Sequence, residues 1–233
     1  MLDYFKFLMF SFWWLLWFFI SLALCLVIVT IVVIAEFIYS MFNFFTMKIK
    51  KILSNLLIMI HKKEIFEKAK EGDKSILKLQ EDRLMIKDKY GKTPIHWLAR
   101  NGDKSILTLP KELLMIQDTW GSTPIHLLAH NKVKEVIILP KSILMIKNKK
   151  GDTPVHWLAM NGVKEVLNLD KELLMIQDND GWTPVHWLAM NGVKEILKLP
   201  KSILMIQNKD GWTPLHLLVV NEIEIPEELK YLI

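Results

Sequence analysis

The pattern of hydrophobic and polar positions divides the chain into two unlike parts. Residues 1–47 contain three charged side chains, Asp3, Lys6 and Glu36, and the 29 residues from 7 to 35 contain none. A helix needs about 20 apolar residues to cross the hydrocarbon core of a bilayer, so this run is long enough for one span. Beyond residue 47, lysines and glutamates alternate with apolar positions, as in soluble proteins. We therefore predict a transmembrane anchor in residues 1–47.

The apolar run has three other possible interpretations: a signal peptide, a lipoprotein signal and a helical hairpin. A secretory signal peptide has an apolar region of roughly 7–15 residues and then a small-residue cleavage site, and neither is found here. The stretch LALC resembles a lipoprotein cleavage box, but Leu24 stands where a small residue is required. A helical hairpin stays open as an alternative, although its second span would include Glu36 and no Gly or Pro marks a turn. In a single span, Glu36 lies near the end and should reach the interface.

The polar flanks of the run predict its orientation. Basic residues are retained on the cytoplasmic side of a span, whereas Asp3 offsets Lys6 on the other flank. The basic flank consists of Lys48, Lys50, Lys51, Lys62 and Lys63. We therefore expect a single-pass membrane protein whose C-terminal part faces the cytoplasm. Aromatic residues at both ends of the run, near residues 10–17 and 37–45, are typical of the two interfaces of one span.

Residues 48–60, KIKKILSNLLIMI, carry apolar side chains at helical spacing with the lysines on another face. A basic amphipathic helix beside a span can lie on an anionic leaflet. It could equally pack against the following domain as a cap, and the pattern does not decide between the two.

From residue 61 onward the apolar pattern repeats every 30 residues. Each full repeat opens with G-x-T-P-x-H, in the forms GKTPIH, GSTPIH, GDTPVH, GWTPVH and GWTPLH, and closes with L-M-I-x-D/N. Thr is a good helix N-cap and Pro suits the first helical position, so each Thr-Pro should start a helix. The Asn-Gly pairs, such as Asn101-Gly102, should stop it, because both residues tolerate left-handed geometry. The pair Asn131-Lys132 breaks this rule and makes its turn more costly.

These motifs resemble the ankyrin repeat, whose mark is G-x-T-P-L-H-x-A followed by a glycine turn and a second helix. The resemblance implies an all-α solenoid of helix-turn-helix repeats with short turn fingers, in addition to the N-terminal transmembrane helix. Two departures are evident: the period is 30 residues instead of 33, and leucine replaces the small residue two positions after each histidine. We infer a shortened second helix or following loop, with the leucines filling the space released. The predicted repeat domain, 61–233, comprises a degenerate copy at 61–90, full copies at 91–120, 121–150, 151–180 and 181–210, and a capping copy at 211–233.

Candidate chemistry in the chain is sparse. Five histidines recur at 30-residue spacing: His96, His126, His156, His186 and His216. Stacked helices lie roughly 8–10 Å apart, which is too far for such a ladder to share metal ions. We therefore predict hydrogen-bonded histidines that brace their turns. No nucleophile, phosphate loop or paired carboxylate stands apart from the repeat pattern, so neither an enzyme, a metal site nor a cofactor is expected. The only cysteine, Cys25, lies in the apolar run.

Functional residues are expected where the repeats differ. The residue after each histidine is Trp97, Leu127, Trp157, Trp187 or Leu217, and the resemblance to ankyrin repeats implies that this position faces the concave groove. Aromatic residues also flank the repeat glycines: Tyr90, Trp120, Trp182 and Trp212. Because aromatic rings are favoured anchors at protein interfaces, we predict that these residues, except the two leucines, bind a partner. The alternative is that the rings stack on neighbouring fingers and stiffen the array.

The sequence thus predicts a membrane-tethered scaffold for protein–protein interaction. Its expected partners are an unidentified protein and, through residues 7–47, membrane lipid. The net charge of +5 is spread among alternating lysines and glutamates, so nucleic acid is not expected, and neither is a small-molecule substrate. The alternative function is a membrane-active oligomer, a pore or transporter, which the repeats regulate.

Overall fold

The structure, a computed structural model, describes residues 2–232, with side chains described at 9, 13, 14 and 16–232. The chain divides into two compact units, Met1–Ile60 and His61–Ile233. Every described residue in a regular element is helical, and none is in a strand. The all-α fold class is therefore confirmed.

The first unit consists of the greater part of helix α1, Leu2–Glu71, which is the one helix among the described residues that is long and apolar enough to cross a membrane. Its apolar side chains are exposed, including Trp13, Trp14 and Trp17. The helix runs without a turn, so the structure does not adopt the hairpin that the sequence left open. The apolar positions of the 48–60 segment are also exposed, at 46–61% for Ile49, Ile52, Leu53, Leu56, Leu57 and Ile60.

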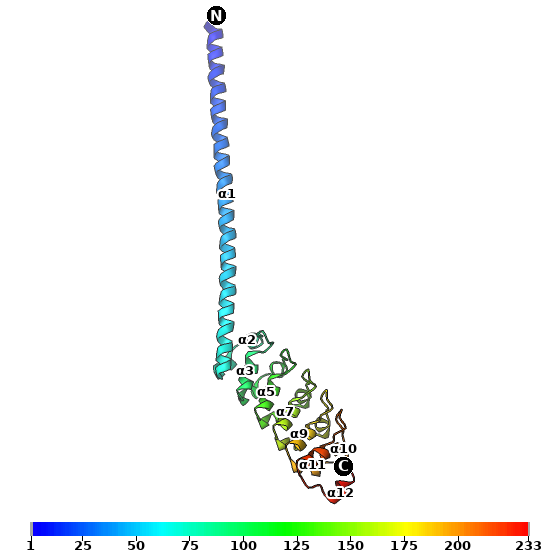
Figure 1. The fold of residues 1–233 in the computed structure, drawn as a ribbon. Helices are drawn as coiled ribbons and strands as arrows, with labels where there is room; N and C mark the ends of the chain where they lie inside the picture. Colours follow the sequence, from blue (N-terminus) through cyan, green and yellow to red (C-terminus); the bar gives the residue numbers. More distant parts are fainter. Residues whose placement is uncertain (1, 233) are drawn as a thin grey trace. The chain divides into compact units, whose positions relative to one another are not determined.

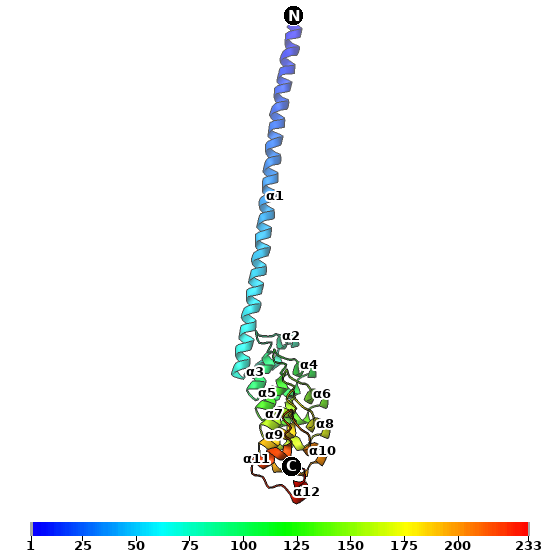
Figure 2. The ribbon, with the colours of Figure 1, turned by 45° about the vertical axis from the view of Figure 1, so that its right-hand side comes forward.

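The second unit is a stack of similar repeats, which Figure 1 shows as a row of first helices side by side in chain order. The first helices of the repeats are α3 (Pro94–Arg100), α5 (Pro124–His130), α7 (Pro154–Met160), α9 (Pro184–Met190) and α11 (Pro214–Val220). Figure 2 shows a second row of short helices beside them. These are α2 (Glu81–Leu84), α4 (Lys111–Leu114), α6 (Lys141–Leu144), α8 (Lys171–Leu174) and α10 (Lys201–Leu204), and α12 (Glu227–Lys230) follows α11.

A 3-10 helix comes directly before each of the short helices α2, α4, α6, α8 and α10, whereas the described residues between α11 and α12 include none. The 3-10 helices are η1 (Lys74–Lys78), η2 (Lys104–Thr108), η3 (Lys134–Ile138), η4 (Lys164–Asn168) and η5 (Lys194–Lys198). The predicted second helix is thus split in two. A 3-10 turn comes first, and a one-turn α-helix capped by Pro110, Pro140, Asp170 or Pro200 follows. Proline, which cannot continue a preceding helix, marks the break in three repeats, but Asp170 has the same backbone conformation, so the break does not depend on proline.

The first helices begin as the sequence predicts. In each, a threonine is the N-cap and a proline occupies the first turn. The helix ends differ from the prediction in one respect. Asn101 has φ −84°, so the asparagine is not left-handed, and only the following residue is, with φ +74° at Gly102. In the third copy Lys132 adopts φ +61° in place of glycine, which is the strained turn that the sequence predicted.

The core runs continuously through the stack. The leucines that replace the expected small residue are fully buried in the full repeats, as Leu98, Leu128 and Leu158 illustrate, together with the alanines that follow them. The degenerate copy begins inside α1, where Ile65, Phe66 and Ala69 are buried. Because each repeat has apolar surface on both sides, only stacking can bury it, as in other solenoids.

Candidate functional site

The fingers between repeats are short turns organised by one acid or amide. In the finger of the second copy, the Asp118 carboxylate accepts the backbone N–H groups of Trp120 and Ser122, each at 2.9 Å. Such side-chain-to-backbone bonds are why Asp and Asn favour turns. Asp88, Asn148, Asp178 and Asn208 play the same role in the other fingers. The residue two positions after each of these is therefore held at the finger tip.

Neighbouring fingers are joined by their backbones. The N–H of Thr119 donates to the carbonyl of Tyr90 at 3.0 Å, and the N–H of Lys149 donates to that of Trp120 at 2.9 Å. The same bond recurs from Asn179 to Lys150 and from Lys209 to Asp180. These close approaches require glycine at the finger base: an added Cβ at Gly151 would lie 2.6 Å from the backbone nitrogen of Asn179.

The histidine ladder joins each first helix to the next repeat. In the first full copy, the Thr93 N–H donates to His96 Nδ1 at 3.0 Å, so the neutral imidazole carries its proton on Nε2. Nε2 lies 3.1 Å from the Ser122 carbonyl of the following repeat, which accepts that proton. The bond recurs from His126 to Asp152, from His156 to Trp182 and from His186 to Trp212. Each of these histidines therefore caps its own helix and ties two repeats together.

Burial favours the neutral form of these histidines. Desolvation lowers the pKa of His96, His126 and His156 to about 4, and it also lowers the pKa of His186. These four histidines are therefore uncharged at neutral pH and do not attract an anion. No group of three His, Cys, Asp or Glu side chains in the described part of the chain is placed to hold a metal ion.

The asparagines form a second ladder that the sequence analysis did not identify. The Asn131 amide donates to the Arg100 carbonyl at 2.9 Å and to the Ala99 carbonyl at 3.2 Å, both in the preceding repeat. Asn101, Asn191 and Asn221 make the same contacts. These carbonyls lie at a helix C-terminus and have no partner within the helix. Asn recurs every 30 residues in the sequence, and this recurrence could have indicated the ladder, but it was interpreted only as a signal for the backbone conformation at the helix end.

The aromatic residues predicted to bind a partner fall into two groups. Tyr90, Trp120 and Trp212 are exposed at 43%, 52% and 42%, and the rings of Tyr90 and Trp120 stack with centroids 5.8 Å apart. Trp97, Trp157, Trp182 and Trp187 are half-buried and pack against the core. The structure thus places the first three rings where a partner could reach them, whereas the other four also support the stack.

Local pairing distinguishes the half-buried tryptophans. Trp182 stacks on Trp187 at 4.6 Å. Trp97 donates its indole N–H to Asp88 at 3.2 Å and lies against the cations of Lys92 and Arg100. Trp157 contacts the edges of two imidazoles, and its indole nitrogen is buried without a hydrogen-bond partner. The three helix tryptophans are therefore not equivalent.

A pocket of about 400 Å³, which we term the central pocket, opens between the fingers and helices α5 and α7. Leu127 and Trp157 contribute apolar side chains from the helices, and Trp120 contributes one from a finger. Lys92, Lys149 and Lys150 also line it. Leu127 stands where three other repeats have tryptophan, and the sequence analysis gave that gap in the row no role.

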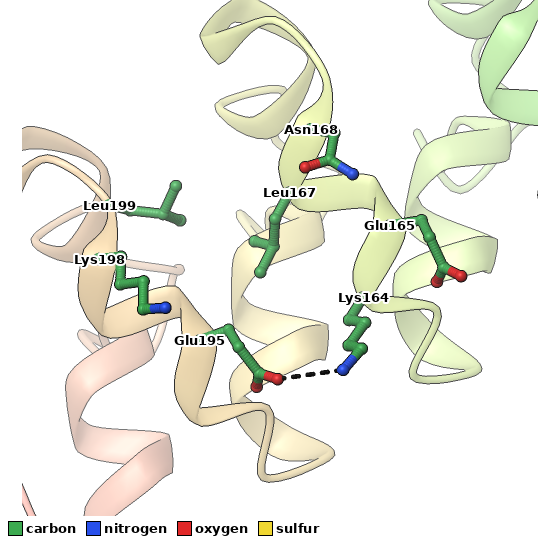
Figure 3. A pocket seen from close by; sticks show the side chains of 7 residues that line it. All are labelled: Lys164, Glu165, Leu167, Asn168, Glu195, Lys198 and Leu199. Carbon is green, nitrogen blue, oxygen red and sulfur yellow. Dashed lines mark hydrogen bonds and ion pairs between the residues drawn. The ribbon is translucent and has the colours of Figure 1, made fainter.

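Along the 3-10 helices, in contrast, lysines of one repeat form ion pairs with glutamates of the next. A pocket of about 470 Å³ there is lined by residues of η4 and η5, including Lys164 and Glu195, whose charged groups lie 3.3 Å apart (Figure 3). Equivalent pairs join Lys104 to Glu135 and Lys134 to Glu165. On this face the repeats satisfy one another's charges. The finger side, with exposed rings and unpaired lysines, is the better candidate for a binding surface.

Comparison with known families gives one result. The family model for ankyrin repeats in three copies matches residues 131–199. No curated protein sequence matches the chain significantly. The match includes two of the five Thr-Pro-x-His motifs, at 153–156 and 183–186, and the turns at Asn131, Asn161 and Asn191, and it confirms the resemblance drawn from those motifs.

Proposed function

Because this chain carries ankyrin repeats, which are modules of protein–protein interaction, we propose that it is a membrane-tethered scaffold holding a cytoplasmic partner near the bilayer. Ankyrin repeats are typically not catalytic, and the described side chains offer no arrangement that suggests otherwise. The observation that carries the proposal is the exposure of aromatic rings on the fingers of a stack whose chain also contains a span-length apolar helix.

The exposure of three rings supports binding over a role in stiffening alone. Tyr90 and Trp120 contact each other, but about half of each side chain still faces solvent, and Trp212 has no stacked neighbour from another finger. Rings that served only to stiffen the stack would bury most of their surface against it. Exposed tryptophans commonly contribute most of the binding energy at protein interfaces.

The anchor and its orientation are part of the proposal. The apolar part of helix α1, residues 7–35, is long enough for one span, and the lysines that follow residue 47 favour the cytoplasm for the repeats. The exposed apolar positions of residues 48–60, opposite their lysines, support contact of that segment with the leaflet. Residues 7–47 would contact lipid directly.

Topology is tested by labelling single cysteines in sealed membranes. In a Cys25→Ser background, Asp3→Cys and Lys209→Cys should react with an impermeant maleimide from opposite sides, with Lys209→Cys on the cytoplasmic side. Labelling of both positions from one side would contradict the single-span anchor.

Binding is tested by cross-linking the full-length chain in native membranes. Trp120→Ala and Trp212→Ala should lose cross-linked partner while the thermal midpoint stays unchanged. Ile138→Ala is the matched control, because Ile138 is 77% exposed but lies on a 3-10 helix away from the fingers. Equal capture by all three variants would refute the finger surface as the binding site.

The alternative, a pore or transporter regulated by the repeats, makes a different prediction. A scaffold can function as one chain per particle, whereas a pore needs several copies of α1. Native mass spectrometry of the detergent-solubilised chain separates the two, and a stable oligomer held together through residues 1–60 would favour the alternative.

A further inference from the structure

The row of tryptophans after the ladder histidines is interrupted at one place. Trp97, Trp157 and Trp187 occupy this position in three repeats, but the repeat between the first two has Leu127. The central pocket lies at this interruption. Its volume, about 400 Å³, falls within the range of roughly 300–1,000 Å³ that is common for binding pockets. The missing indole therefore leaves room for a side chain from outside.

The walls of the central pocket are suited to an apolar side chain. Leu127, Trp157 and Met160 face it from the helices, and Trp120 from the finger. Burial of a large apolar side chain against these walls would favour binding. Trp120 is half exposed in the free protein, so an occupant of the pocket would also cover this ring.

The charges around the central pocket select the chemistry of the occupant. In the described part of the chain, Lys92, Lys149 and Lys150 form no ion pair. The two acids of the pocket, Asp118 and Asp152, are at most 8% exposed and accept hydrogen bonds from their own fingers. The groups presented to a partner are thus cationic, and they favour acidic residues.

A buried donor gives a further indication. The indole N–H of Trp97 is paired with Asp88, but the position equivalent to Asp88 in the repeat of Trp157 is Asn148. The amide of Asn148 is occupied by Asp152 and by backbone groups of its own finger. The Trp157 N–H is left without an acceptor, as is the Trp187 N–H, although Trp187 has Asp178 at the position equivalent to Asp88. A carbonyl or carboxylate oxygen of an occupant would supply one, and buried donors are costly to leave unpaired.

We propose that the central pocket binds a partner segment in which one bulky apolar residue is flanked by acidic residues. This inference rests on the proposed scaffold function and names its partner by chemistry. The apolar residue fills the place of the missing indole, and the acids face the three unpaired lysines. The next finger along the stack carries Asp178 and Asp180, so the acidic stretch would lie over the earlier fingers and avoid that one.

The first experiment measures binding of a labelled synthetic peptide to the full-length chain in detergent micelles. The probe has nine residues, with a central leucine flanked by glutamates, and a second probe has serine in place of the leucine. Fluorescence anisotropy should show at least tenfold weaker binding of the serine probe. Equal binding of the two probes would refute the apolar anchor.

Filling the pocket from within gives the sharpest variant. Leu127→Trp introduces the residue that the fold already carries at Trp97, Trp157 and Trp187, so the stack should tolerate it. We expect at least tenfold weaker binding of the leucine probe with an unchanged thermal midpoint. Leu217→Trp, at the equivalent position of the last repeat and outside the pocket, should bind as the wild type does. Unchanged binding by Leu127→Trp would overturn the proposal.

The charge requirement is tested separately. The double variant Lys149→Glu with Lys150→Glu should weaken binding of the leucine probe at least tenfold and remove most of its salt dependence, because exposed charges are screened by salt. Lys209→Glu, on a finger away from the pocket, is the control. Tighter binding of a single-stranded oligonucleotide than of the leucine probe would show that the lysines serve nucleic acid, and would refute the peptide.

The two proposals fail in different ways. If Leu127→Trp retains the cross-linked partner in membranes and the leucine probe does not bind the wild type, the peptide chemistry is wrong and the scaffold function stands. If no variant of the fingers changes partner capture, the scaffold surface itself is wrong.

Discussion

The seam between repeats and the surface of the fingers differ in how they use the repeated sequence. At the seam, His and Asn occupy the same positions in successive copies, and most of them make the same bonds to the neighbouring repeat, whereas the Asn161 amide donates to Trp157 of its own repeat. At the finger tips, the residues vary from Lys89-Tyr90 to Thr119-Trp120, Lys149-Lys150 and Asn179-Asp180. The recurring positions hold the stack together, whereas the varying positions give each finger its own chemistry.

This difference shows how a repeat protein can change its binding surface without changing its fold. A finger tip is held mainly by backbone bonds and by one Asp or Asn, so the side chains at the tip can vary, although Tyr90 stacks on Trp120 and the Asn179 amide donates to the Lys149 carbonyl of the adjacent finger. A seam residue has partners on both sides. Mutations at the seam should therefore act on stability and mutations at the tips on binding.

Acidification should have the largest effect, because it acts on several seam positions at once. The pKa of about 4 in the folded state lies below the ordinary value of 6.5 for His96, His126 and His156. The unfolded chain therefore binds more protons between these values, and stability is full above pH 6.5 and falls as pH drops toward 4. Protonation of each histidine should lower the free energy of unfolding by about 3 kcal/mol over this range. Chemical denaturation of the full-length chain in micelles at several pH values measures the loss.

Two variants sharpen the acid experiment. His156→Gln removes one titrating group and should flatten the dependence on pH, although it also weakens the seam at neutral pH. His130→Gln changes an exposed histidine outside the ladder and should leave the profile as it is. A profile unaffected by His156→Gln would contradict the role of the ladder.

Gly151→Ala should have the second largest effect. The glycine has φ +83°, and a methyl group would meet the backbone of the next finger at 2.6 Å. Left-handed strain costs about 1–2 kcal/mol and overpacking about 1–3 kcal/mol, so we expect a loss of about 2–5 kcal/mol in unfolding free energy. Gly211→Ala is the control, since it has φ +82° but no atom within 4 Å of its added Cβ. Losses of equal size would show that the close approach contributes nothing.

Tryptophan variants should distinguish the finger surface from the packed stack, because the same substitution should affect binding in one region and stability in the other. Trp120→Ala removes an exposed ring and should weaken partner binding by about 2 kcal/mol, roughly thirtyfold, with little change in stability. Trp187→Ala removes a ring that packs on Trp182 and the core, and it should lower stability by about 3 kcal/mol or more. Cross-linking and thermal unfolding on both variants provide the comparison. If capture is lost only where stability is lost, the rings are structural.

Lys132→Gly should have the smallest effect. Lysine at φ +61° is strained, and glycine adopts this conformation freely at the cost of a more flexible unfolded chain. We expect a gain of about 0.5–1 kcal/mol, measured by denaturant unfolding. The same change at a residue with ordinary backbone angles, Lys104→Gly, should destabilise instead. A loss of stability in Lys132→Gly would show that the lysine side chain compensates for its strain.

The sequence predicts the first helices well because their signals are local. Thr at the N-cap, Pro in the first turn and a left-handed residue after the last turn act within one helix, and each is found where expected. The split of the second helix was harder to predict. A shortened second helix or loop was expected, but the 3-10 geometry before Pro110 depends on how the shortened repeat packs on its neighbours.

The candidate site was only partly accessible from sequence. Of the four aromatic residues expected beside the repeat glycines, Tyr90 and Trp120 lie at finger tips, whereas Trp182 and Trp212 follow the glycines and lie outside the tips. The stacking of Tyr90 on Trp120 depends on the distance between adjacent fingers. The central pocket could not be predicted, because it lies where an indole is missing. Leu127 is a common residue in its own repeat, and its small size matters only by comparison with Trp97 and Trp157 at the equivalent position. Likewise, Lys149 and Lys150 form no ion pair because the nearby acids Asp118 and Asp152 are buried in their own fingers. The order of residues along the chain does not reveal this burial.

The reach of the seam bonds has a consequence for how the stack forms and lengthens. The Asn131 amide bonds back 31 and 32 residues, the His126 imidazole bonds forward 26, and neither contacts anything beyond the adjacent copy. Because these hydrogen bonds join only adjacent copies, folding can start at any copy and spread to its neighbours in either direction. It also implies that duplicating one 30-residue segment would insert a copy already equipped for both neighbours. The length of the stack, and hence the number of finger pairs available for binding, can change in whole steps without redesign of the rest.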